Sequence, residues 1–117
     1  MEIRKEEIEI KKSKFIAYLY ELDSLDEAKK AIEDLKKEHK KANHVCYAYV
    51  YSKELVAEKC SDDGEPKGTA GYPILNVIKM KKANNVLVAV VRYFGGIKLG
   101  AGGLTRAYTK SAASVLN

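Results

Sequence analysis

One uninterrupted apolar stretch, NVLVAVVRYF at residues 85–94, limits the possible folds more than any other segment of the chain. Apolar and β-branched residues at almost every position are typical of a strand that is covered on at least part of both faces. Such a strand has to lie inside a sheet. The rest of the chain must therefore supply neighbouring strands and amphipathic helices to pack against it.

Further strands are predicted from the alternation of apolar and polar residues. Four segments show this alternation: residues 8–10, SKFIAYLY (13–20), HVCYAYVY (44–51) and LVAEKC (55–60). The last two are close in sequence, so we expect them to pair antiparallel. Cys46 and Cys60 would then lie nearly opposite each other. Because they lack the spacing of a metal site, we interpret them as small core residues.

Three helices are predicted. Ser24 and Glu27 match a capping box ahead of an apolar stripe. Pro73 suits the first turn of a second helix, and a third is expected from about Gly103 to Leu116. The resulting order ββαββαβα predicts a single α+β domain over residues 1–117. We expect a two-layer sandwich, with the helices on one face of a sheet of about five strands.

Formal charge is divided unevenly along the chain. All sixteen acidic residues lie at or before Glu65, so residues 66–117 carry +8 and residues 1–65 carry −3. Uncompensated positive charge attracts polyanions and raises their encounter rates, which favours an anionic partner. Ordinary solubilising lysines would give the same count, so this interpretation stays open beside the first.

Nothing in the sequence predicts a membrane partner. No apolar run approaches the roughly 20 residues of a membrane span, and the N-terminal segment MEIRKEEIEIKK does not resemble a signal peptide. We therefore expect a cytoplasmic protein.

The segment RYFGGIKLGAGGLTRAY, residues 92–108, places five glycines in nine positions between a predicted strand and a predicted helix. It does not match a nucleoside-triphosphate P-loop, because Ala101 and Gly102 stand where that motif has a lysine and a hydroxyl residue. It does not match a dinucleotide fingerprint either, because no acidic residue follows to hold a ribose. Glycines ahead of a helix N-terminus suit close approach of an anion, although they also permit close packing alone. The candidate anion-binding or nucleic-acid-binding residues are Arg92, Tyr93, Gly95, Gly96, Lys98, Gly100, Gly102, Gly103 and Arg106.

A second glycine-bearing segment, SDDGEPKGTAG at residues 61–71, is predicted to be an ordered loop that supports the first. Its candidate residues are Asp62, Asp63, Gly64, Glu65, Lys67, Gly68, Thr69 and Gly71. The three carboxylates suggest an alternative, a nucleotide- or phosphate-dependent enzyme that uses them for metal binding or acid–base chemistry. Turn formation explains the same residues. No nucleophile constellation, metal site or cofactor is predicted.

A row of tyrosines follows one face of the strand at 44–51. Tyr47, Tyr49 and Tyr51 alternate with smaller apolar residues. Such a row can stack on bases, or can be core with its hydroxyls directed to the edge of the sheet. Both interpretations stay open.

Three segments resemble the IMPACT/YigZ family over essentially the whole chain: KKSKFIAYL (11–19), SDDGEPKGTAGYPIL (61–75) and NVLVAVVRYFGGIKLGAGGLTRAY (85–108). The resemblance implies a two-layer α+β fold shared with a domain of a small-subunit ribosomal protein and with domain IV of elongation factor G. It also implies a link to translation, since eukaryotic IMPACT proteins act through a protein partner on the pathway that activates the initiation-factor kinase during amino-acid starvation. Lys67 and Tyr72 depart from the family pattern, which puts contacts at those two positions in doubt.

Members of this family carry further domains, ferredoxin-like in bacteria and RWD in eukaryotes, and partner binding by those domains is not expected of residues 1–117. The sequence thus predicts a translation-associated binding module that holds RNA, a ribosomal surface or another anion at its glycine-bearing loops. A nucleotide-dependent enzyme and a protein–protein interaction module in stress regulation of translation are the alternatives.

Overall fold

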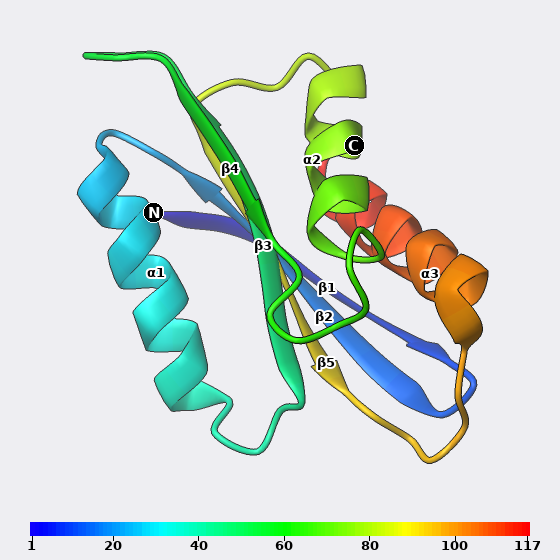
Figure 1. Ribbon diagram of the computed structural model, residues 1–117. Coiled ribbons are helices and arrows are strands. Elements are labelled where there is room, and N and C mark those ends of the chain that lie inside the picture. Colours follow the sequence, from blue (N-terminus) through cyan, green and yellow to red (C-terminus); the bar gives the residue numbers. More distant parts are fainter.

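The computed structural model describes residues 1–117 as one five-stranded antiparallel sheet with three helices (Figure 1). The elements are β1 (Glu2–Ile10), β2 (Ser13–Glu21), α1 (Leu25–Glu38), β3 (His44–Tyr51), β4 (Ala57–Ser61), α2 (Gly71–Met80), β5 (Val86–Tyr93) and α3 (Gly100–Val115). The predicted α+β class, the order ββαββαβα and the five strands are all confirmed.

The strands lie in the order β1-β2-β5-β3-β4, so β5 is the central strand. It pairs antiparallel with β2 on one side and with β3 on the other. Side chains from Leu87 to Val91 are fully buried, as the apolar stretch predicts. The centre of the sheet is therefore dry on both faces.

Helices cover both faces of the sheet, and the prediction of helices on one face is wrong. Figure 1 shows α1 on one side of the strands and α2 with α3 on the other. Val88 and Val90 of β5 belong to the core under α2 and α3, whereas Leu87, Ala89 and Val91 pack on the α1 side. Because a central strand that is apolar on both faces requires cover on both, a single helical layer would have left one of these rows exposed.

Local signals place the first helix as predicted. Ser24 and Glu27 form the capping box at the start of α1, with Ser24 accepting from the Glu27 N–H at 3.3 Å. Tyr51 faces α1 and is fully buried, and Tyr47 and Tyr49 pack partly buried beside it. The tyrosine row of β3 thus belongs to this core.

Two smaller predictions require correction. Cys60 lies opposite Ala48 rather than Cys46 and is exposed, because β4 is an edge strand. Helix α3 begins at Gly100, three residues earlier than expected, so Gly100, Gly102 and Gly103 form its first turn. No helix has the length and apolar character needed to cross a membrane.

Candidate anion-binding site

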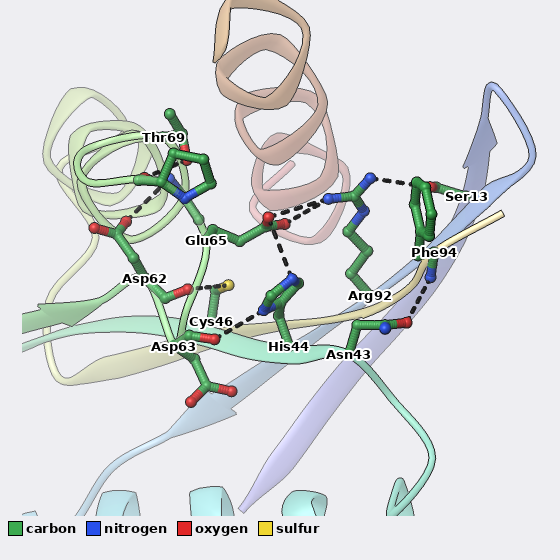
Figure 2. Close-up of polar contacts among 12 residues, drawn as sticks. Ser13, Asn43, His44, Cys46, Asp62, Asp63, Glu65, Thr69, Arg92 and Phe94 are labelled. Carbon is green, nitrogen blue, oxygen red and sulfur yellow. Dashed lines mark hydrogen bonds and ion pairs between the residues drawn. The ribbon is translucent and has the colours of Figure 1, made fainter. Parts of the chain in front are cut away.

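Glu65 is the centre of a buried polar network at one end of the sheet (Figure 2). Arg92 Nη1 lies 2.8 and 3.1 Å from its two carboxylate oxygens, and the Tyr108 hydroxyl donates to it at 2.5 Å. His44 Nε2 is 3.3 Å from Glu65 Oε1. Burial raises the pKa of Tyr108, so its hydroxyl stays protonated and donates. A single carboxylate thus joins β3, β5 and α3.

Asp62 organises the loop at residues 62–70, which we call the acid loop. Its carboxylate accepts three backbone hydrogen bonds, from Gly68 at 2.9 Å, Ala70 at 3.1 Å and Gly71 at 2.8 Å. Burial acts to raise the pKa of Asp62, but the three N–H groups outweigh it and hold the pKa below its usual range. The last two bonds satisfy N–H groups at the start of α2, where no side chain of the helix provides a cap.

Asp63 ties the acid loop to β3. Its Oδ2 accepts from the Val45 N–H at 2.7 Å, and its carbonyl lies 2.8 Å from His44 Nδ1. A carbonyl oxygen only accepts, so Nδ1 carries a proton. Cys46 lies beneath, donating to the Asp62 carbonyl at 3.1 Å, and burial raises its pKa to about 12.

The carboxylates of the predicted supporting loop are therefore engaged within the protein. Asp62 and Asp63 accept backbone bonds, and Glu65 is paired with a guanidinium. No group of three or more potential metal-ligating side chains gathers anywhere in the chain. Within the same loop, Thr69 Oγ1 donates to the Pro66 carbonyl at 2.6 Å, whereas Lys67 is exposed and Gly64 and Gly68 adopt positive φ.

Arg92 does not present its charge to solvent as the sequence suggested. The residue is 5% exposed, its Nη1 pairs with Glu65, and its Nη2 donates to Ser13 Oγ at 3.2 Å. The guanidinium carbon lies over two aromatic rings, 5.5 Å from the centroid of Phe15 and 5.5 Å from that of Phe94. Its Nε has no hydrogen-bond partner. This cation is thus largely compensated from within the protein.

Tyr93 is also placed differently from the prediction. It points to the α1 side of the sheet, where its hydroxyl lies 2.7 Å from His39 Nδ1. It therefore cannot contact a ligand held at the start of α3, because the two lie on opposite faces of the sheet.

A hollow of about 430 Å³ opens beside the first turn of α3, and we call it the α3 hollow. Its lining includes His44, Glu65, Arg92, Phe94, Lys98 and Gly100. The buried Glu65 and Arg92 form part of its wall, whereas Lys98 is exposed. The hollow thus lies between the acid loop and residues 94–99, which we call the glycine loop.

The start of α3 leaves its backbone donors free of side-chain partners. No side chain caps it, and the first turn contains no acidic residue. Free N–H groups at a helix N-terminus favour an anion through their positions and through the helix dipole. Gly100, the first residue of the helix, has a φ of +75° with no atom within 4 Å of an added Cβ.

Arg106 lies at a separate, smaller hollow of about 180 Å³. Lys11 and Lys110 line it together with Arg106, and Leu99 borders both hollows. Lys11, Lys98, Arg106 and Lys110 are exposed, and none of them forms an ion pair. We call these four residues the basic cluster; Lys11 lies in the β1–β2 turn, Lys98 in the glycine loop, and Arg106 and Lys110 on α3, and they line the two hollows that share Leu99.

The sequence profile of the Impact N-terminal domain family matches residues 11–116. The chain belongs to this family. It is 50% identical over 111 residues to the IMPACT family member YvyE of Bacillus subtilis, covering 95% of this chain and 51% of that protein. It is 44% identical over 102 residues to the IMPACT family member YigZ of Escherichia coli, covering 86% of this chain and 50% of that one. The chain thus spans about half the length of the curated relatives it matches, and the predicted family is confirmed.

Two solved structures share the Impact fold. One, described as a hypothetical protein, superposes with a TM-score of 0.89 at 40% identity and covers 96% of this chain and 55% of that chain. The other, the two-domain translational regulator Yih1, superposes with a TM-score of 0.60 at 26% identity and covers 94% of this chain and 43% of the Yih1 chain.

Sequence reasoning missed three residues of this Impact domain's α3 hollow. Phe94 is 46% exposed at its rim, and Asn43 Oδ1 accepts from the Phe94 N–H at 2.8 Å. His44 carries no motif signal in the sequence, yet it contacts both Asp63 and Glu65. A sequence signal for Phe94 was available, because an aromatic residue at the end of a strand and directly before a glycine pair is a poor candidate for the core.

Proposed function

We propose that this chain is an RNA-binding module that acts in the regulation of translation. In this proposal the phosphate backbone lies across the basic cluster and the first turn of α3. The module binds by charge and by backbone N–H groups, with no chemical conversion of the RNA.

The observation that carries the proposal is the exposed, unpaired state of the basic cluster. Lys98, Arg106 and Lys110 belong to the acid-free part of the chain, whereas Lys79 of the same part pairs with Glu58 at 3.1 Å. Lys11 joins them from the β1–β2 turn. Cations without carboxylate partners beside free helical N–H groups suit the phosphates of a nucleic acid.

The link to translation rests on relatives. Yih1 is described as a two-domain translational regulator, and its fold matches 94% of the residues of this chain. An RNA-binding surface suits such a role because ribosomes and messenger RNA present phosphate to their regulators.

A salt series tests the RNA proposal. Fluorescence anisotropy with labelled single-stranded RNA should give an association constant that falls steeply as salt rises. The double variant Lys98→Ala/Arg106→Ala removes two phosphate contacts, so the slope of log K against log salt should become shallower by about 1.4.

Lys79→Ala is the control for the loss of a positive charge outside the basic cluster, since it removes one such charge from a residue already paired with Glu58. It should leave the slope nearly unchanged. A double variant with the slope of the unmodified chain would refute binding at this end of the molecule.

A further inference from the structure

Phe94 is an exposed aromatic ring with a cation behind it. It is 46% exposed and lines the α3 hollow, while the Arg92 guanidinium carbon lies 5.5 Å from its ring centroid. The Phe94 N–H donates to Asn43 Oδ1 and the Gly95 N–H donates to Ser13 Oγ, so the backbone that carries the ring is fixed on both sides. A fixed, exposed ring of this kind is a stacking surface for a planar group.

The remaining walls of the α3 hollow differ in their chemistry. Asn43, His44 and Glu65 supply polar side chains, and the Glu65 carboxylate is paired with Arg92. Pro66, Leu99 and Leu104 supply apolar surface. Lys98, Gly100 and Ala101 supply a positive charge and the first residues of a helix without a cap. A ligand that matches both parts has a flat apolar body and an anionic group.

Arg92 provides an observation independent of the helix. It lines the hollow, is 5% exposed, and its Nε has no hydrogen-bond partner. An unpartnered buried donor is costly unless something compensates it. An anionic group bound in the hollow would stabilise this cation, to which the face of the Phe94 ring already contributes.

We propose that the α3 hollow binds one nucleotide of single-stranded RNA, with the base stacked on Phe94 and its phosphate at the first turn of α3. This proposal rests on the RNA-binding function above and names the part of the RNA that is read. A duplex does not fit it, because bases stacked inside a helix cannot lie flat against Phe94. The volume of about 430 Å³ falls within the range of about 300 to 1,000 Å³ usual for small-ligand sites.

Base stacking is tested with two probes of equal charge. One is labelled octauridylate, and the other is an abasic chain of eight ribose phosphates. Phe94→Leu should weaken octauridylate binding about tenfold, since each base–aromatic stack contributes appreciably to affinity, and should leave the abasic chain unaffected. Phe94→Tyr should restore octauridylate binding, because it keeps the ring.

Tyr72→Leu is the matched control. Tyr72 is also an exposed aromatic, at 62%, but it lies on α2 outside the α3 hollow. This variant should bind both probes as the unmodified chain does. If Phe94→Leu weakens both probes equally, or neither, the stacking proposal is overturned.

The phosphate position is tested separately by nuclear magnetic resonance. Titration with uridine 5′-monophosphate should shift the amide signals of Gly100 and Ala101, whereas uridine without phosphate should shift them much less. Equal shifts with both, or none with the monophosphate, overturn the assignment.

The two proposals fail in different ways. Octauridylate binding by Phe94→Leu with undiminished affinity and the salt dependence of the unmodified chain overturns the nucleotide site and leaves the RNA-binding function intact. Absence of salt-dependent binding by the unmodified chain overturns the RNA-binding function itself.

Discussion

The two glycine-bearing loops look alike in sequence and behave oppositely in the fold. In the acid loop, Asp62, Asp63 and Glu65 all turn inward to backbone N–H groups or to Arg92. The glycine loop is held mainly by two backbone donors, at Phe94 and Gly95. The presence of internally paired carboxylates, rather than the glycine content, therefore distinguishes the architectural acid loop from the more open glycine loop.

The comparison is tested most severely at Glu65. Glu65→Ala leaves the Arg92 guanidinium buried without its carboxylate, which should lower the free energy of unfolding by about 3 to 5 kcal/mol. Urea denaturation measures it. Glu58→Ala, which removes the exposed partner of Lys79, should cost less than about 1 kcal/mol. Similar losses in both variants would contradict the special role of the acid loop.

A smaller loss is expected within the glycine loop itself. A Cβ at Gly95 would lie 1.9 Å from the Lys12 carbonyl oxygen, so Gly95→Ala should destabilise the fold by about 3 kcal/mol. At Gly96 an added Cβ meets nothing within 4 Å, and only the φ of +92° opposes it. Gly96→Ala should therefore cost about 1 kcal/mol. Thermal or urea denaturation of the pair distinguishes close packing from backbone conformation, and equal losses would refute the distinction.

Asp62 should make stability depend on pH. Its pKa is lower in the folded protein than in the unfolded chain, so its contribution is present above the unfolded value of about 3.9 and is lost as pH falls through the folded one. Asp62→Asn should lower stability at neutral pH by about 2 kcal/mol and flatten the acid limb of the stability curve. Parallel acid limbs for the two proteins would show that the loop is held by other groups.

The smallest effect on stability is expected at Lys98. It is exposed and forms no ion pair, so Lys98→Ala should change the free energy of unfolding by less than about 0.5 kcal/mol. The same variant should make the salt dependence of RNA binding shallower by about 0.7. A stable variant with unaltered RNA binding would contradict a role of the glycine loop in binding RNA.

The sequence predicted the parts of the fold that are encoded locally. The apolar stretch at residues 85–94 identified the central strand, and Ser24 with Glu27 identified the start of α1. The side of the sheet that α1 covers depends on how the chain crosses over, which no local pattern records. The same apolar stretch nevertheless implied cover on both faces, and that implication outweighs the two-layer expectation.

The sequence predicted the region of the candidate site, but it did not predict which of its side chains bind one another. Arg92 and Glu65 are 27 positions apart, and Tyr108 is 43 positions from Glu65. Arg92 and Glu65 each looked available when considered alone. They come together because β3 pairs with β5 on one side and with β4 on the other, while α3 packs against the sheet. This arrangement converts a predicted ligand contact at Arg92 into an internal ion pair.

The absent side chain of Gly95 has a consequence beyond packing. The β1–β2 turn, with Lys11 and Lys12 both at positive φ, packs closely against the glycine loop, because a side chain at Gly95 would lie 1.9 Å from the Lys12 carbonyl oxygen and none is present. Lys11 of the turn and Lys98 of the glycine loop, which are far apart in the chain, are thereby carried by two segments that contact each other. In the proposed RNA complex the attachment points of these lysines would already be arranged, so the protein would lose less conformational entropy on binding than it would with two independent loops.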